Sequence, residues 1–217
     1  MPFRKKLLDN NRKWAASKLA ADPAFFSRIA DSQKPEILWI GCADARVPAP
    51  EIIGMQPGEL FVHRNIANLV YHTDINCQAV IEYAVDALKV KYVIVCGHYN
   101  CGGIRHAILN TEFGIIDNWL KEVKDVYQTH MDELLKITDP HARLNRLTEL
   151  NVRHQALNIC RTSIVQKAWA RGQELSVHAW VYDVRDGLVR DLKLAYRNPY
   201  NVEPIYRYHA QAEGEDH

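Results

Sequence analysis

The sequence predicts an α/β fold, with a mainly parallel β-sheet flanked by helices and a helical arm at the N-terminus. Segments typical of strands alternate with segments of helical periodicity, and the run KYVIVCG at 91–97 is apolar almost throughout. Such a run is typical of a strand covered on both faces, as parallel strands are. Since neither repeats nor a Ser/Gly-rich linker divide the chain, we expect one domain over residues 1–217, with about 1–34 as the arm.

The first expected elements are the helical arm and two strands. Residues 3–30 have the pattern of an amphipathic helix, with Pro23 as a break. Residues 37–41 are rich in apolar and β-favouring side chains and predict the first strand. Residues 60–65 predict the second strand, which the turn-forming pair at 57–58 introduces.

The later elements continue the alternation of helix and strand. Thr73 or Asp74 can cap a helix that runs to about Leu88, and the strand at 91–97 follows it. The remaining expected elements are a helix at about 115–136, a helical region from about 141 to Arg171 ended by Gly172, a strand at 175–181, and a turn at 185–187 leading to a short hairpin partner.

Composition narrows the class of protein. A chain of 217 residues with 47% hydrophobic and 24% charged residues is typical of a globular domain with one well-buried core. Because 27 basic residues balance 26 acidic ones, we expect a small-molecule partner, and neither nucleic acid nor a membrane. No apolar run approaches the roughly 20 residues that span a bilayer, and the N-terminus lacks a secretory hydrophobic region. We therefore expect a cytoplasmic protein, with organelle targeting left open, whose five cysteines form no disulfides.

Two clusters of reactive side chains follow predicted strands. Cys42, Asp44 and Arg46 occupy alternate positions after the first strand, and His98 and Cys101 follow the strand KYVIVCG. Ligands bind at the carboxyl ends of strands in open parallel sheets, so we expect the two clusters to converge. Two thiols, an imidazole and a carboxylate form a ligand set that tetrahedral Zn²⁺ accepts. Each residue alone would be an ordinary core or loop residue, but the set predicts a zinc site.

The motifs of these clusters resemble those of the β-class carbonic anhydrases. CADAR occupies residues 42–46 and HYNCGG occupies residues 98–103. The similarity continues through the segments at 56–68, 81–90 and 161–187, so it covers most of the chain. It implies a β-carbonic-anhydrase-like fold and a zinc lyase that interconverts carbon dioxide and bicarbonate.

The resemblance also implies roles for the clustered residues. One zinc ion per subunit is held by Cys42, His98 and Cys101, while Asp44 either completes the tetrahedron or swings away to pair with Arg46. When Asp44 is away, the open position takes a water that the metal acidifies to the hydroxide attacking carbon dioxide. The paired carboxylate would then orient this hydroxide, so Asp44 and Arg46 are the expected catalytic residues.

A substrate pocket, a regulatory site and a subunit interface follow from the same resemblance. In relatives the pocket is completed across a subunit boundary, which implies a homodimer or a homotetramer whose arm at about 1–34 embraces a neighbour. One subgroup binds a second, inhibitory bicarbonate that favours the aspartate on zinc and lowers activity near neutral pH. The substrate-binding residues by this resemblance are Gln33, Val47, Phe61, Tyr83 and Gly102, and the regulatory residues are Trp39, Arg64 and Tyr182.

Two other functions stay open at this point. The same zinc site would serve a hydrolase of carbon disulfide or carbonyl sulfide, because fold and ligands alone do not fix the substrate. A non-enzymatic bicarbonate-binding or scaffold protein with a closed structural zinc is the third hypothesis. Arg46 beside Asp44 argues against it, because a closed site needs no group to capture a departing ligand.

Overall fold

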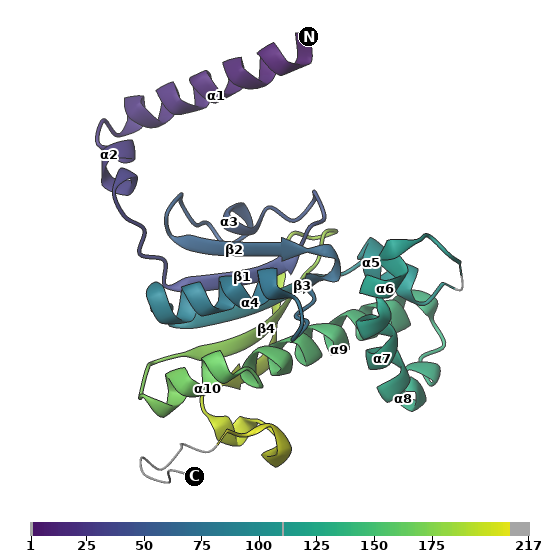
Figure 1. Ribbon diagram of the computed structural model, residues 1–217. Coiled ribbons are helices and arrows are strands. Elements are labelled where there is room, and N and C mark those ends of the chain that lie inside the picture. The colour runs from purple at the N-terminus through teal and green to yellow at the C-terminus, as the bar shows by residue number, and fades with distance from the viewer. Residues whose placement is uncertain (1, 110, 209–217) are drawn as a thin grey trace. The chain divides into compact units, whose positions relative to one another are not determined.

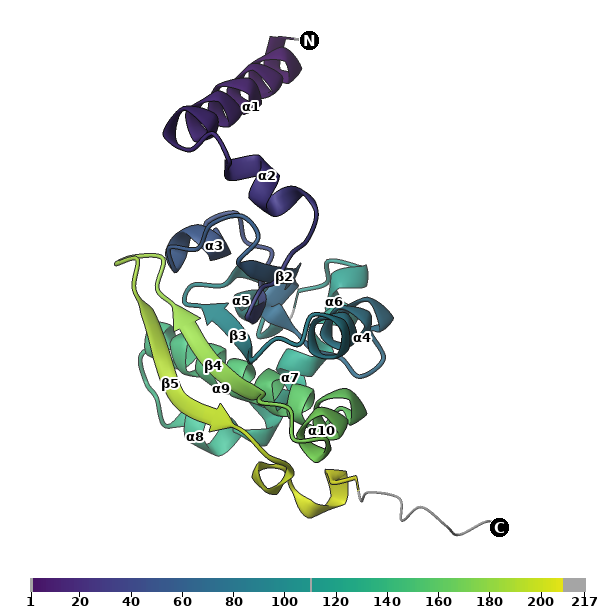
Figure 2. The same ribbon diagram turned by 90° about the vertical axis from the view of Figure 1, so that its left-hand side faces the viewer.

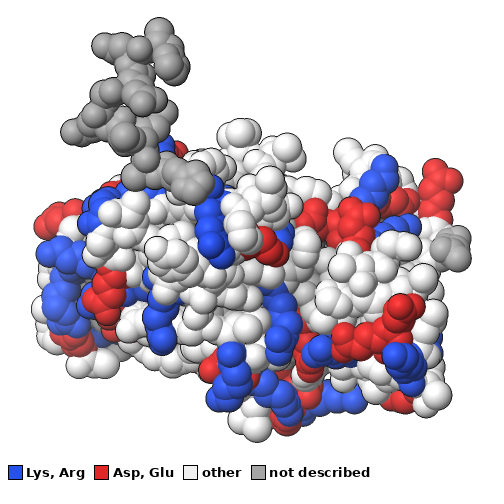
Figure 3. Space-filling view, turned by 90° about the horizontal axis from the view of Figure 1, so that it is seen from below, with Lys and Arg blue, Asp and Glu red and all other residues white. Residues whose placement is uncertain are grey.

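The computed structural model of the chain describes residues 2–109 and 111–208 (Figure 1). Between Lys34 and Pro35 the chain divides into two compact units. Within the described ranges, every helix is too short or too polar to cross a lipid bilayer. Basic and acidic side chains are interspersed on the face that Figure 3 shows, in keeping with a net charge of +1.

The smaller unit consists of two helices. Helix α1 spans Pro2–Ala21 and helix α2 spans Phe25–Ala30. The break falls at Pro23, which has no backbone N–H to continue the helical hydrogen bonds. Trp14 and Phe26 pack edge to face, with ring centroids 5.7 Å apart, and so join the two helices. The predicted helical segment and its break are confirmed.

The larger unit is built around a five-stranded sheet in the order β2-β1-β3-β4-β5 (Figures 1 and 2). The first four strands are parallel, and the last pairs antiparallel with its neighbour. The strands are β1 (Ile37–Cys42), β2 (Leu60–Asn65), β3 (Tyr92–His98), β4 (Ser176–Tyr182) and β5 (Val189–Tyr196). The predicted strands and the mainly parallel sheet are confirmed.

The main core lies between one face of this sheet and three helices. These are α4 (Ile75–Glu82), α9 (Pro140–Cys160) and α10 (Ser163–Ala170). Their apolar side chains share a fully buried cluster with strand residues such as Leu38 and Val95. Each such aliphatic side chain contributes about 1.5–3 kcal/mol when buried. Asp74 caps α4 as predicted, since its carboxylate accepts the N–H of Asn76.

The prediction of one continuous helix at about 115–136 was wrong. The segment at about 115–136 forms three short helices: α6 (Ile115–Trp119), α7 (Lys121–Thr129) and α8 (Met131–Leu135). The chain turns at Leu120 and at His130, where ψ rises to 2° and 20°. These turns let Leu120 and a side chain from each of α7 and α8 enter one second core cluster, which a straight helix could not reach.

The later helical region divides at Arg161 and Thr162. The Thr162 hydroxyl accepts the N–H of Val165 and begins α10 as an N-cap. Gly172 follows with a φ of +74°, the left-handed conformation predicted for a C-terminal glycine. The helix expected to run to about Leu88 does so, because α4 continues into a π-helical turn over Tyr83–Ala87. Short elements that the sequence did not reveal are α3 (Ala49–Ile52), α5 (Gly102–Ala107), and the 3-10 turns Ile66–Asn68, Pro199–Asn201 and Pro204–Tyr206.

The end of β3 approaches α9 closely at Gly97. A Cβ there would lie 2.5 Å from Cγ2 of Val152 and 3.2 Å from Oδ1 of Asn68. Gly97→Ala should therefore destabilise the protein by about 1–3 kcal/mol in urea unfolding, because the packed neighbours must move. Gly102→Ala is the matched control and should not lower stability, since a Cβ at Gly102 meets nothing within 4 Å. Equal unfolding midpoints for the two variants would contradict the close approach.

Candidate metal centre

The two reactive clusters meet at the carboxyl ends of β1 and β3, which are adjacent and parallel. Cys42 ends β1, His98 ends β3, and Cys101 lies in the turn before α5. The Sγ atoms of the two cysteines are 3.8 Å apart, and all three ligand atoms lie within 4.8 Å of one another. The exposed fractions are 5% for Cys42, 0% for His98 and 1% for Cys101. The segments thus converge as the topology predicts.

This donor set fits a tetrahedral zinc ion. Two sulfurs bonded to one tetrahedral zinc at about 2.3 Å lie about 3.8 Å apart, which matches the separation of Cys42 and Cys101. Nδ1 of His98 donates to the carbonyl oxygen of Tyr99 at 3.0 Å, which leaves Nε2 with its lone pair. Among the described residues this buried Nε2 has no hydrogen-bond partner. Buried polar atoms are nearly always paired, and an ion between the thiols would supply the partner.

The two thiols differ in acidity because they are coupled. The hydrogen bond from Cys101 lowers the pKa of Cys42 to about 4, against the opposing effect of burial. The same hydrogen bond, together with burial, raises the pKa of Cys101. Zinc binds thiolates, so the pair offers one ready ligand and a second that loses its proton when a cation enters.

Asp44 is held by Arg46 at the edge of the cluster. The guanidinium donates from Nε to Oδ1 at 2.9 Å and from Nη2 to Oδ2 at 2.7 Å. This bidentate pair holds the pKa of the Asp44 carboxyl well below its usual range. Oδ2 lies 3.6 Å from Nε2 of His98, and Arg46 also donates to the carbonyl oxygen of Asn100. The carboxylate is therefore ionised, oriented and adjacent to the metal-ligating atoms.

Arg64 supports the loop that carries these residues. From β2, its Nε donates to the carbonyl oxygen of Cys42 at 2.9 Å and its Nη2 to that of Asp44 at 2.6 Å. The backbone N–H of Ala43 donates to the carbonyl oxygen of Asn65, which ties the same loop to the end of β2. The position of Asp44 is thus linked to the side chain of Arg64.

Trp39 and Tyr182 lie in one cluster on the sheet face opposite the main core. Trp39 is fully buried, and its Nε1 has no hydrogen-bond partner among the described residues. A Cβ on Gly41 would lie 2.4 Å from this nitrogen, so the indole covers Gly41, next to Cys42. Tyr182 stands opposite His98 in the register of β3 and β4. Trp39 and Tyr182 are therefore anchored close to the chain segments that carry the metal ligands.

The expected substrate-binding residues are placed differently from one another. Val47 is buried just after Arg46, and Gly102 begins α5. Phe61 stands opposite Leu38, which precedes Cys42 by four residues, or about 13 Å along the strand. Its ring contacts that of Tyr83 at a centroid distance of 5.8 Å. Within one subunit these two aromatic side chains do not reach the metal cluster, and Gln33 belongs to the smaller unit.

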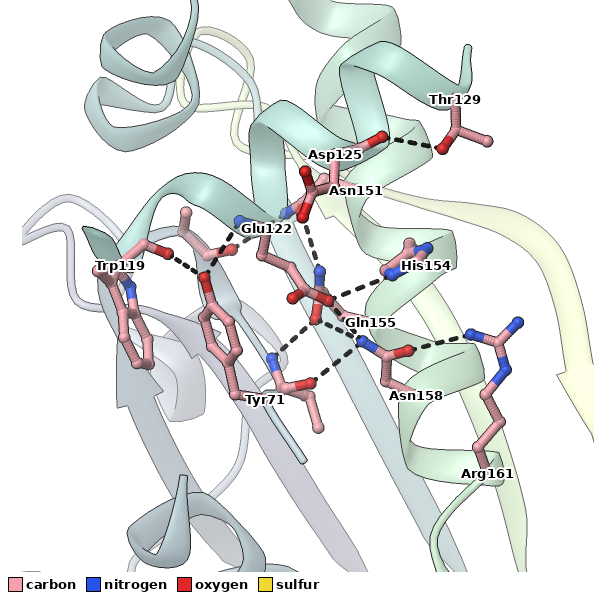
Figure 4. Close-up of polar contacts among 12 residues, drawn as sticks. Tyr71, Trp119, Glu122, Asp125, Thr129, Asn151, His154, Gln155, Asn158 and Arg161 are labelled. Atoms are coloured by element: carbon pink, nitrogen blue, oxygen red, sulfur yellow. Dashed lines mark hydrogen bonds and ion pairs between the residues drawn. The ribbon is translucent and has the colours of Figure 1, made fainter. Parts of the chain in front are cut away.

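A buried polar network that the sequence analysis missed joins helix α9 to the chain near Tyr71 (Figure 4). Three amide side chains on one face of α9 bind the backbone after β2. Asn151 donates to the carbonyl oxygen of Ala67 at 3.1 Å, and Gln155 accepts the N–H of Val70 at 2.8 Å. Asn158 donates to the carbonyl oxygen of Val70 at 3.2 Å. The network holds the loop backbone at Ala67 and Val70, while Leu69 between them is bound through both its N–H and its carbonyl oxygen to the side chain of Asn65.

This loop forms part of the wall beside the metal cluster. Ala67 and Asn68 have φ angles of 66° and 50°, a conformation that needs support from outside for residues other than glycine. A Cβ on Gly103 would lie 2.8 Å from Cγ2 of Ile66, so the loop packs against the start of α5 and hence beside Cys101. Amides at the spacing 151, 155 and 158 on an otherwise apolar helix face are the signal that would have indicated it.

Fold and site together define a class of protein: an α/β enzyme with a Cys/His/Cys group that could hold a metal at the strand ends. Residues 37–189 match the family described as Carbonic anhydrase. A carbonic anhydrase of Emericella nidulans is 48% identical over 191 residues, which cover 88% of this chain and 84% of that protein. The chain belongs to the β class of the carbonic anhydrase family.

Solved structures agree with this assignment. A β-carbonic anhydrase of Coccomyxa, in complex with acetazolamide, matches with a TM-score of 0.86 and 42% identity, over 90% of this chain and 89% of that one. A structure described as one of two tetrameric β-carbonic anhydrases from Sordaria macrospora has the same TM-score and identity, over 90% of this chain and 100% of that one. The predicted family, fold and enzyme class are confirmed, and the family is one of zinc enzymes.

Proposed function

We propose that this carbonic anhydrase hydrates carbon dioxide reversibly to bicarbonate and a proton at one zinc ion held by Cys42, His98 and Cys101. The observation that carries the proposal is the buried, unpaired Nε2 of His98 beside two thiols 3.8 Å apart. Bound zinc would lower the pKa of a coordinated water and so supply a nucleophile near neutral pH. The remaining steps fall to side chains of the chain itself.

Asp44 orients the attacking water. Because Arg46 keeps its carboxylate ionised and bidentately held, Asp44 can accept a hydrogen bond from that water and direct a lone pair toward carbon. The pairing also keeps Asp44 from taking the fourth ligand position itself. Val47 adds apolar wall for an uncharged linear substrate, and the N–H of Gly102 donates to a substrate oxygen.

The pocket takes residues from a second subunit. Phe61 stands level with Leu38, about 13 Å along the strand from Cys42 of its own chain, and the ring of Tyr83 contacts that of Phe61. We therefore assign them, with Gln33, to the pocket of a neighbouring copy, in a homodimer or homotetramer with the arm at about 1–34 in the interface. The tetrameric description of the Sordaria macrospora enzymes supports the oligomer that this assignment requires.

Stopped-flow kinetics test the proposed reaction. Hydration of carbon dioxide by the zinc-loaded protein should be fast, and its kcat/KM should far exceed those for carbon disulfide and carbonyl sulfide. A higher kcat/KM for carbon disulfide or carbonyl sulfide would show that this analogue is the substrate and that the same zinc site acts on it. A zinc-loaded protein that turned over none of the three would instead point to a closed, structural ion.

A second proposal concerns regulation by bicarbonate at Trp39, Arg64 and Tyr182. Its support is the fully buried Nε1 of Trp39, a donor without an acceptor among the described residues. Bicarbonate offers acceptor oxygens for this N–H and a charge for Arg64. Since Arg64 holds the carbonyl oxygens of Cys42 and Asp44, an anion that draws it away would release the loop and favour Asp44 on the metal.

Trp39→Phe should separate regulation from catalysis, because it keeps an aromatic ring in the core and removes the N–H. We expect the bicarbonate concentration that halves activity to rise by about 10-fold or more, the effect of a lost hydrogen bond to a charged group. Trp169→Phe is the control, because Nε1 of Trp169 donates to the carbonyl oxygen of Leu175 in another part of the fold. Equal inhibition of Trp39→Phe and Trp169→Phe by bicarbonate would contradict a regulatory site at Trp39.

A further inference from the structure

A second group of metal-ligating side chains lies where β2 meets the start of α4. It consists of His63, Asp74 and Cys77, whose ligand atoms all lie within 4.8 Å of one another. His63 is 8% exposed and Cys77 is fully buried. Among the described residues, the catalytic Cys/His/Cys cluster is the one other group that meets this spacing. The proposed reaction uses none of these three side chains.

Local structure explains why these side chains converge. Asp74 is the N-cap of α4 and uses Oδ1 to accept the N–H of Asn76 at 3.1 Å. Cys77 follows three residues later, so it lies on the same side of the first helical turn. His63 stands opposite Ile40 in the register of β1 and β2, within the sheet that α4 covers. The spacing of Asp74 and Cys77 equals that of the histidine and cysteine in the catalytic cluster.

The chemistry of the group suits a transition metal. Burial lowers the pKa of His63, so the imidazole is neutral and keeps one lone pair, and the one polar contact printed for its ring is a long one, 3.4 Å from Nε2 to Nδ2 of Asn65. Burial raises the pKa of Cys77 to about 12, so without an ion the group holds a thiol beside one carboxylate. A divalent ion that binds all three displaces the thiol proton to solvent, and the carboxylate and thiolate then balance its charge. One sulfur and one nitrogen favour Zn²⁺, Co²⁺ or Cd²⁺ over Mg²⁺ and Ca²⁺.

The helix start acts on the ion in two ways. Its partial positive charge, about half an elementary charge, disfavours a cation nearby. The same charge stabilises the thiolate of Cys77 and so lowers the cost of losing its proton. Two full negative charges in direct contact with the ion outweigh the half charge of the helix, so the net balance favours binding.

Solvent reaches one edge of the group. A surface cavity of about 390 Å³ is lined in part by Asp74, Thr73 and Tyr71. It offers an entry path for the ion, an exit for the proton and room for a water as fourth ligand. The group therefore has the ligands, the charge and the access that a metal site requires.

We propose that His63, Asp74 and Cys77 form a second metal site, which binds one zinc-like divalent ion and ties the edge strand β2 to helix α4. The site is separate from the zinc centre of the proposed function, since the two share no residue. A bound ion would link an edge strand, exposed along one side in this subunit, to the main core, and so raise the melting temperature of the enzyme.

Metal binding to the zinc-loaded protein tests this site directly. Cd²⁺ is titrated by calorimetry into protein that already holds one zinc per chain, and both metals are then counted by mass spectrometry after gel filtration. We expect one Cd²⁺ to bind per chain with the first zinc retained, and the melting temperature to rise. Asp74→Asn should weaken Cd²⁺ binding by about 10-fold or more, while asparagine keeps the N-cap of α4.

Cys77→Ala should abolish the second binding event, and Cys160→Ala is its matched control. Cys160 is also a fully buried cysteine on a core-facing helix, but it belongs to neither group of metal ligands. If Cys77→Ala does not fold, the Asp74→Asn protein decides the question. A wild-type protein that binds no Cd²⁺ beyond the first zinc overturns the proposal, and so does a second ion bound equally well by Asp74→Asn. Whether Cys42→Ala loses the first zinc is measured in a separate experiment. A failure of the zinc centre can therefore be told apart from a failure of the second site.

Discussion

Cys42→Ala is expected to remove the zinc ion and to lower the rate of carbon dioxide hydration by on the order of 10³-fold or more. The variant leaves two protein ligands, and Cys101 loses the thiol to which it hydrogen-bonds at 3.8 Å. Without the metal, water at neutral pH has no group that acidifies it. Zinc per chain is measured by mass spectrometry, and the rate by stopped flow on the same preparation.

Cys96→Ala provides the matched control for this loss. Cys96 is fully buried on β3, two residues before His98, and its thiol donates to the carbonyl oxygen of Gly97. It contributes no atom to the metal cluster, so this variant should keep its zinc and most of its activity. A Cys42→Ala protein with one zinc per chain would show that the ion is bound elsewhere.

Arg46→Gln should lower kcat by about 10²-fold while zinc stays bound, because the metal ligands are untouched and the orienting carboxylate loses its partner. In the native protein Arg46 holds the pKa of Asp44 well below its usual range. Without the guanidinium this pKa rises, so Asp44 becomes protonated at a higher pH as the solution is acidified. We therefore expect the acid limb of the kcat profile to shift to higher pH, measured by stopped flow across a pH series.

Two further variants sharpen this prediction. Arg46→Lys keeps the charge but not the bidentate geometry, so its kcat should lie between those of the wild type and Arg46→Gln. Arg185→Gln removes an exposed arginine from the hairpin turn and should leave the profile unchanged. An Arg46→Gln protein with native kcat and an unshifted acid limb would mean that Asp44 does not act through this pair.

The strands were predictable because their signal is local. The runs at 37–41 and 91–97 are apolar and β-favouring along their whole length, and both form parallel strands. The division of the segment at about 115–136 into three helices was not predictable, because the turns at Leu120 and His130 satisfy a core assembled from distant parts of the chain. Helical periodicity reports which face is apolar, and it does not report where the axis bends.

In the site, the metal ligands were predictable from the sequence and the amide network on α9 was not. Cys42, His98 and Cys101 converge because strand ends meet at one edge of a parallel sheet, which topology alone implies. The amide network could not be read in the same way, since Asn151 binds the backbone of Ala67, a partner 84 residues away. Such partners become visible only when helix and loop are placed together.

X-ray absorption at the zinc edge of the purified native protein tests directly whether Cys42, His98 and Cys101 hold the ion. We expect one zinc per chain with two sulfur ligands at about 2.3 Å and one nitrogen at about 2.0–2.1 Å, completed by one oxygen. Protein without stoichiometric zinc, or zinc surrounded by nitrogen and oxygen alone, would contradict this prediction.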